Sequence, residues 1–151
     1  MAMTMNGEYE LSVPPQTVWE KLNDAATLKA CIPGCEQLDK TSDTEFQAVA
    51  TVKIGPVKAK FKGRVTLSDL DPPNGYKISG QGDGGVAGFA KGGATVKLAP
   101  KNGGTLLSYN VDAQIGGKLA QLGQRLVNGA AKKIADDFFA NFANAVNPKA
   151  V

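Results

Sequence analysis

The chain has 151 residues, of which 42% are hydrophobic and 21% are charged, and its formal net charge is +3. This length and composition predict a single soluble domain over residues 1–151. No apolar run approaches the roughly 20 residues that cross a bilayer, and the mild positive charge gives no reason to expect a nucleic-acid partner.

The N-terminal segment predicts one strand followed by two short helices. Residues 7–13 alternate between polar and apolar side chains, and Pro14-Pro15 ends this strand because proline lacks the N–H that a ladder needs. Thr17–Leu22 reads as a first helix, and Asp24 is a suitable N-cap for a second helix that runs to Ala30. Residues 1–6 lack a signal-peptide pattern, and two cysteines are too few for a disulfide framework. We therefore expect a cytoplasmic protein.

Residues 44–115 repeat apolar side chains with a period of two, which is typical of half-buried antiparallel strands. Gly55-Pro56, residues 71–75 and residues 102–104 are the expected turns. Seven glycines in residues 80–93 predict a bulged or flexible strand pair. The buried phase is unusually rich in alanine and glycine, whereas protein interiors normally fill with large side chains. The sequence therefore predicts a ligand cavity beside the sheet.

From about residue 117 to 146 the apolar period becomes helical, and Asn147-Pro148 is expected to end this helix. Gly123 and Gly129 weaken it by about 1 kcal/mol each. The order of elements predicts an α+β helix-grip fold. A curved antiparallel sheet of about seven strands would wrap around the long C-terminal helix, with two short helices after the first strand and a pocket between sheet and helix.

Catalytic and metal-binding patterns are poorly represented. The chain has no histidine, which removes histidine-based triads and metal sites, and its acidic residues are scattered. Cys31 and Cys35 provide two of the four ligands that zinc needs, so two small hydrophobic side chains are the simpler interpretation. The glycine-rich segment at 80–86 lacks the Lys-Ser/Thr of a phosphate-binding loop. We therefore expect neither catalytic residues nor a metal site.

A row of basic side chains, here called the basic ladder, occupies the outward phase of one strand. Its members are Lys58, Lys60, Lys62 and Arg64. Edge protection and solubility explain such a row, and so does docking to an acidic protein or to an anionic membrane surface. No aromatic residues alternate with these cations, which argues against single-stranded nucleic acid.

Several segments in the right order resemble one known family. They include Val13-Pro-Pro15 with Val18-Trp19, Cys31-Ile-Pro-Gly-Cys-Glu36, Gly55-Pro-Val-Lys58, Phe61-Lys-Gly63, Asp71-Pro-Pro73, Gly80-Gln-Gly82 and Gly116-Gly-Lys-Leu-Ala-Gln-Leu-Gly123. The chain resembles the carbon monoxide dehydrogenase G-subunit family, a branch of the START-like (Bet v 1-like, SRPBCC) superfamily. The resemblance implies a helix-grip fold. It also implies a non-catalytic accessory of a molybdenum-containing carbon monoxide dehydrogenase or related hydroxylase.

The resemblance further implies that the protein carries a quinone, or recruits its enzyme to the inner face of the cytoplasmic membrane. Many members extend into a low-complexity tail that reaches the membrane, and we expect none in residues 1–151. We expect a non-covalently bound quinone or lipid, with Tyr109 offering its phenol to a quinone carbonyl. The candidate ligand-binding residues are Leu28, Ile32 and Phe89 at the mouth, and Phe46, Ala48, Ala50, Phe61, Gly63, Val96, Tyr109 and Leu126 along the walls.

Two other functions remain open. One is an adaptor or maturation factor that binds the enzyme through the basic ladder without a ligand. The other is a cyclase or hydrolase of the START-like superfamily, which the lack of histidine and of a paired acid and base disfavours.

Overall fold

A computed structural model describes residues 1–146 of the chain. Its elements, in chain order, are β1 (Ala2–Leu11), α1 (Pro15–Leu22), α2 (Ala25–Cys31), β2 (Cys35–Ser42), β3 (Glu45–Ile54), β4 (Val57–Asp71), β5 (Gly75–Asp83), the 3₁₀ helix η1 (Gly85–Ala87), β6 (Phe89–Lys101), β7 (Gly104–Gly116), α3 (Lys118–Gln121) and α4 (Gln124–Val146).

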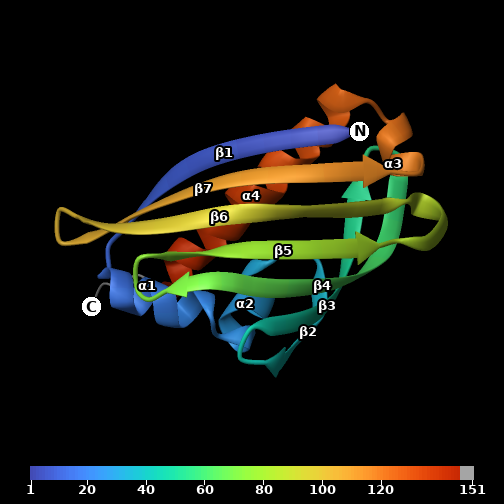
Figure 1. The fold of residues 1–151 in the computed structure, drawn as a ribbon. Coiled ribbons are helices and arrows are strands. Elements are labelled where there is room, and N and C mark those ends of the chain that lie inside the picture. The colour runs from blue at the N-terminus through green and yellow to red at the C-terminus, as the bar shows by residue number, and fades with distance from the viewer. Residues whose placement is uncertain (147–151) are drawn as a thin grey trace.

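The strands form one antiparallel sheet in the order β1-β7-β6-β5-β4-β3-β2. Figure 1 shows this sheet curving around α4, with α1 and α2 below the sheet near the C-terminal end of α4. Each connection from β2 to β7 joins neighbouring strands, so the chain order of the hairpins determines most of the sheet order. The predicted α+β helix-grip fold is confirmed.

The period of two correctly identifies the inner face of the sheet. Phe46, Leu67, Val96 and Leu107 are all buried and belong to one core cluster with Phe142 of α4. Burying a large apolar side chain stabilises the fold by about 1.5–3 kcal/mol. The main core therefore joins the C-terminal half of α4 to α1 and to the inner face of the sheet.

The N-terminal elements form where the sequence places them, with shifted ends. The first strand runs from Ala2 to Leu11 rather than over 7–13, because residues 2–6 continue its pairing with β7. The predicted cap at Asp24 is confirmed, since its carboxylate accepts hydrogen bonds from the Thr27 backbone N–H (3.2 Å) and hydroxyl (2.6 Å). The strand β2, which has no separate predicted range, follows the turn at Pro33-Gly34.

The glycine-rich segment is more regular than expected. Gly80 pairs with Gly92 and Gly82 with Ala90 in an uninterrupted β5–β6 register, so the predicted bulge is wrong here. The register shifts instead between Ser68 and Asp71 of β4. Glycines on both strands pair without side chains to clash, and a single turn of 3₁₀ helix closes the hairpin.

The single helix predicted over about 117–146 is two helices. Gly123 adopts a left-handed backbone with φ +92° between α3 and α4, and its N–H bonds to the carbonyl of Ala120. Glycine adopts this conformation without a Cβ penalty, so it ends α3 and lets α4 start in a new direction. The expected stop at Asn147-Pro148 lies outside the described residues. Within residues 1–146, no helix is long and apolar enough to cross a membrane.

Candidate functional site

An apolar cavity of about 470 Å³ lies between the inner face of the sheet and α4. Its volume is within the range of small-molecule sites in proteins. The walls are almost entirely apolar, and the lining residues are Met3, Met5, Ile32, Pro33, Val52, Ile54, Phe61, Gly82, Ala90, Ala113, Ile115, Leu119, Val127, Ala131, Ile134, Ala135 and Phe138.

Small residues on facing elements create this space. Gly82, Ala90 and Ala113 occupy the inward phase of three neighbouring strands, and Ala131 and Ala135 face them from α4. Side chains of this size leave the gap between sheet and helix unfilled. The alanine and glycine content of the buried phase therefore correctly indicated a cavity.

The connection from α2 to β2, here called the mouth loop (Ile32–Gly34), brings Ile32 and Pro33 to the cavity. Gly34 has φ +74°, and a Cβ built on it would lie 2.2 Å from the carbonyl oxygen of Thr51 on β3. The Thr51 N–H in turn donates to the carbonyl of Gly34 at 2.9 Å. Glycine is therefore required where the loop crosses β3.

Further hydrogen bonds hold the loop on both sides. On one side, the side-chain amide of Asn141 on α4 donates to the carbonyl of Cys31 at 3.0 Å. On the other, Glu36 accepts a hydrogen bond from the Thr51 hydroxyl at 2.7 Å and pairs with Lys60 at 3.2 Å. These two contacts hold the pKa of the Glu36 carboxyl below its ordinary value.

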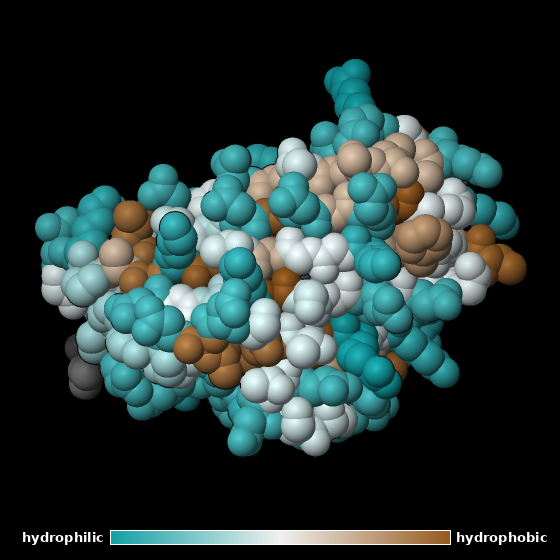
Figure 2. All heavy atoms as spheres, viewed as in Figure 1, coloured by the Kyte–Doolittle hydropathy of each residue, from teal (hydrophilic) through white to brown (hydrophobic). Residues whose placement is uncertain are grey.

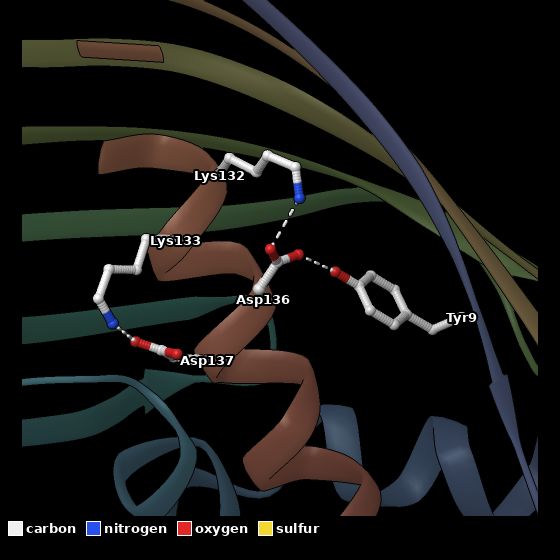
Figure 3. Close-up of polar contacts among 5 residues, drawn as sticks. All are labelled: Tyr9, Lys132, Lys133, Asp136 and Asp137. Atoms are coloured by element: carbon white, nitrogen blue, oxygen red, sulfur yellow. Dashed lines mark hydrogen bonds and ion pairs between the residues drawn. The ribbon is translucent and has the colours of Figure 1, made fainter. Parts of the chain in front are cut away.

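A polar group of three side chains, Tyr9, Lys132 and Asp136, connects α4 to β1 beside the cavity (Figure 3). The hydroxyl of Tyr9 donates to Asp136 at 2.7 Å, and Lys132 pairs with the second oxygen of that carboxylate at 2.8 Å. The Tyr9 ring also stacks on Phe139, with centroids 4.3 Å apart. Partial burial and the neighbouring carboxylate raise the pKa of the Tyr9 phenol above its ordinary value, so it remains a donor at neutral pH.

A smaller hollow of about 360 Å³, here called the side hollow, lies against this polar group. It shares Met3, Met5 and Ala131 with the cavity and adds Tyr9 and Tyr109. An apolar chamber is therefore adjacent to a space with hydroxyl, ammonium and carboxylate groups. Such a pair suits a ligand that is mostly apolar and has a few polar atoms.

The structure brings two of the predicted ligand residues, Ile32 and Phe61, into the cavity wall. Four others are packed in or against the main core rather than along the cavity: Leu28, Phe46, Val96 and Tyr109. Of these, Tyr109 also lines the side hollow, where its ring stacks on Phe139 with centroids 5.3 Å apart. Ala50 faces inward on β3 without lining the cavity.

Phe89 and Leu126 lie away from the cavity. Phe89 is on the outward phase of β6, where its ring covers Gly116 and remains 47% exposed. The period of two explains this position, because Ala90 and not Phe89 is in phase with the buried Val96. Leu126 is 40% exposed and contacts Gly55 at the β3–β4 turn.

A third hollow, here called the outer hollow, lies on the opposite face of the sheet and measures about 770 Å³. Lys62 and Arg64 of the basic ladder line it, together with Phe89 and the backbone around Ala48 and Gly63. Lys60 and Arg64 each pair with a glutamate at 3.2 Å, Glu36 and Glu45 respectively. The ladder is thus partly neutralised, and its role as a partner surface remains a prediction.

Several cavity residues on α4 were not predicted from the sequence, including Val127, Ile134 and Phe138. Their helical spacing predicts that they lie on the buried face of the helix. The same spacing does not distinguish residues that face a cavity from residues that face the core. Ile134 is 38% exposed although it is apolar and lies on this stripe, and only the structure shows that it lines the cavity.

Groups suited to catalysis or metal binding are sparse in the described part of the chain. Residues 1–146 contain no cluster of three or more cysteine or carboxylate side chains that could hold a metal ion. Cys31 is buried in the core, and burial raises the pKa of its thiol.

Comparison with known structures places the fold in a class. The chain is similar to Ara h 8.0201 (14% identity, TM-score 0.68, 97% of this chain and 98% of that one). It is also similar to the aromatase/cyclase ZhuI from Streptomyces sp. R1128 (11% identity, TM-score 0.70, 97% and 94%). Identities this low show the fold alone, which is the Bet v 1-like helix grip.

A sequence profile identifies the family. The profile of the carbon monoxide dehydrogenase G-subunit (CoxG) matches residues 7–147, so the chain belongs to this family. A conserved protein from Geobacillus kaustophilus is 34% identical, with a TM-score of 0.89 and 95% of each chain covered. No curated protein matches the chain.

Proposed function

We propose that this protein is a non-enzymatic accessory of a molybdenum-containing carbon monoxide dehydrogenase or related hydroxylase. It binds a quinone or lipid between the sheet and α4 and links the enzyme to the cytoplasmic membrane. The observation that carries the proposal is the apolar cavity of about 470 Å³. Membership of the CoxG family supports the accessory role.

The residues present suit a quinone. A prenylated quinone is apolar over its ring and tail, which matches the walls built from Ile54, Phe61 and Phe138. Its polar atoms are carbonyl oxygens, which accept hydrogen bonds, and the side hollow next to the cavity contains the Tyr109 hydroxyl and the Lys132 ammonium as donors. A quinone would supply two-electron redox chemistry, and the protein would supply only binding and shielding from water.

Filling the cavity from α4 tests this proposal. Ala131 lines the cavity and Ala140 is exposed on the same helix, so Ala131→Phe and Ala140→Phe form a matched pair. We expect a short-chain benzoquinone at about 100 times its Kd to raise the melting temperature of wild type and Ala140→Phe by about 5–10 °C. Ala131→Phe should show no such rise. An equal rise in both variants would contradict the assigned site.

The outer hollow favours a second candidate function, an adaptor that binds the enzyme without a ligand. Lys62 lines this hollow and has no ion pair among the described residues, so it is available to an acidic partner. The two functions differ in ligand content. A chain that binds no apolar molecule would favour the adaptor.

A further inference from the structure

Three of the five exposed large apolar side chains of the described residues lie at one end of the molecule. Among the described residues, the large hydrophobic side chains with high exposure are Leu70, Val86, Phe89, Leu126 and Ile134. Val86, at 84% the most exposed, is in η1, and Phe89 follows it. Isolated apolar side chains on a surface are common, so the arrangement of the segments that bear them matters more than their count.

Three segments meet at this end, here called the η1 end: residues 53–58, 83–89 and 116–126. The side chain of Leu126 lies against Gly55 at the β3–β4 turn. A Cβ on Gly117 would lie 2.5 Å from the Cα of Gly88, so those two backbones touch. Figure 1 shows the β3–β4 turn, the β5–β6 turn and α3 together at this end, and Figure 2 shows apolar atoms exposed there.

The net positive charge of the chain is concentrated in the same segments. They contain Lys53, Lys58, Lys118 and Arg125, and one carboxylate, Asp83, which accepts a hydrogen bond from the Gly85 N–H at 2.8 Å. The remainder of the chain has equal numbers of acidic and basic residues, since the whole chain has 17 basic and 14 acidic ones. None of the four cations forms an ion pair with a described residue.

The η1 end is also the end wall of the cavity. Ile54, Leu119 and Val127 line the cavity, and each lies in one of the segments of the η1 end or directly after it. An apolar surface surrounded by unpaired cations therefore lies directly outside an apolar chamber. A bilayer docked on this end would therefore lie next to the chamber.

We propose that the η1 end docks on an anionic phospholipid surface and that the cavity exchanges its ligand there. Val86 and Phe89 enter the interfacial layer, while Lys53, Lys58, Lys118 and Arg125 face the lipid phosphates. Docking is inferred from the charge and exposure at this end alone. Ligand exchange also rests on the proposed carrier function.

Co-sedimentation of the full chain with lipid vesicles tests the docking. The probes are vesicles of phosphatidylcholine with about one third phosphatidylglycerol, and vesicles of phosphatidylcholine alone. Val86→Asp and Arg125→Glu alter the η1 end. Leu70→Asp and Lys97→Glu make the same kinds of change at the opposite end, beside the β4–β5 turn. All four side chains are exposed, so the variants should fold, and circular dichroism checks this.

We expect wild type to prefer the anionic vesicles and to lose this preference as salt rises. Arg125→Glu should weaken binding at least about fivefold, because one basic side chain near an anionic surface contributes about that factor. Val86→Asp should weaken it by at least as much, because it replaces an inserted apolar side chain with a carboxylate that anionic lipid repels. Leu70→Asp and Lys97→Glu should remain within about twofold of wild type. Equal binding to both vesicle types, or equal losses at both ends, would overturn the inference.

Extraction of ligand from the same preparations separates this inference from the proposed function. Val86→Asp with normal ligand content and weak vesicle binding would support docking as a distinct property. A wild-type chain that binds anionic vesicles and contains no ligand would support the docking surface and contradict the carrier function.

Discussion

At the scale of single residues, the mouth of the cavity depends on Gly34. We expect Gly34→Ala to destabilise the fold by about 2–5 kcal/mol, since a left-handed alanine costs about 1–2 kcal/mol and the clash with the Thr51 carbonyl adds about 1–3 kcal/mol. Gly103 has φ +80° with open space around it, so Gly103→Ala isolates the backbone cost. Urea unfolding of both variants measures the difference, and equal losses would contradict the account of the mouth loop.

Single residues are also where prediction from the sequence was least complete. Two cavity residues could be predicted from local rules. Ile32 lies in a turn that follows a helix, and Phe61 lies on the inward phase of its strand. Phe89 was assigned wrongly because its glycine-rich surroundings suggested a pocket mouth, whereas its strand phase points outward. Ile134 and Phe138 could not be assigned to the cavity, because the space they face depends on how far α4 lies from the sheet.

At the scale of elements, the contact between β1 and α4 should depend on pH. Hydrogen bonds from Lys132 and Tyr9 hold the pKa of Asp136 below its ordinary value of 3.8. A carboxyl with a lower pKa in the folded chain stabilises the fold above its unfolded pKa, and this contribution is lost as the pH falls below about 4.

We therefore expect the melting temperature of Asp136→Asn to fall less than that of wild type between about pH 7 and about pH 3. Asp137 is the next residue on the same helix and pairs with Lys133 of that helix. Asp137→Asn is therefore the control variant. Melting curves across this range make the comparison. If Asp136→Asn and wild type fall in parallel, the tether between β1 and α4 does not contribute as described.

Element types were predictable and their junctions were not. Alternation with a period of two defined six of the seven strands, because burial on one face of a sheet imposes that pattern. The break at Gly123 was expected only as a weakening of one helix. A glycine inside an apolar stripe fits a weakened helix and a left-handed junction equally well. Packing of Leu119 in one buried cluster with Ile115 and Val127 selects the junction.

At the scale of the whole molecule, the fold places its main core and its cavity at different ends. Phe142, Leu107 and Val18 are fully buried where α1 and the C-terminal half of α4 meet the sheet. Small residues and the cavity occupy the other end, next to the η1 end. The main core can therefore stabilise the fold while the cavity is empty or occupied, which is the property a ligand carrier needs.

The central claim is that the cavity holds an apolar molecule, and the most direct test is mass spectrometry of an organic extract of the purified chain. The protein should be produced in a host that makes quinones. We expect a quinone or lipid in near-stoichiometric amount from wild type and Ala140→Phe, and its loss from Ala131→Phe. Extracts that contain no such molecule from any of the three proteins, or the same amount from all of them, would contradict the claim.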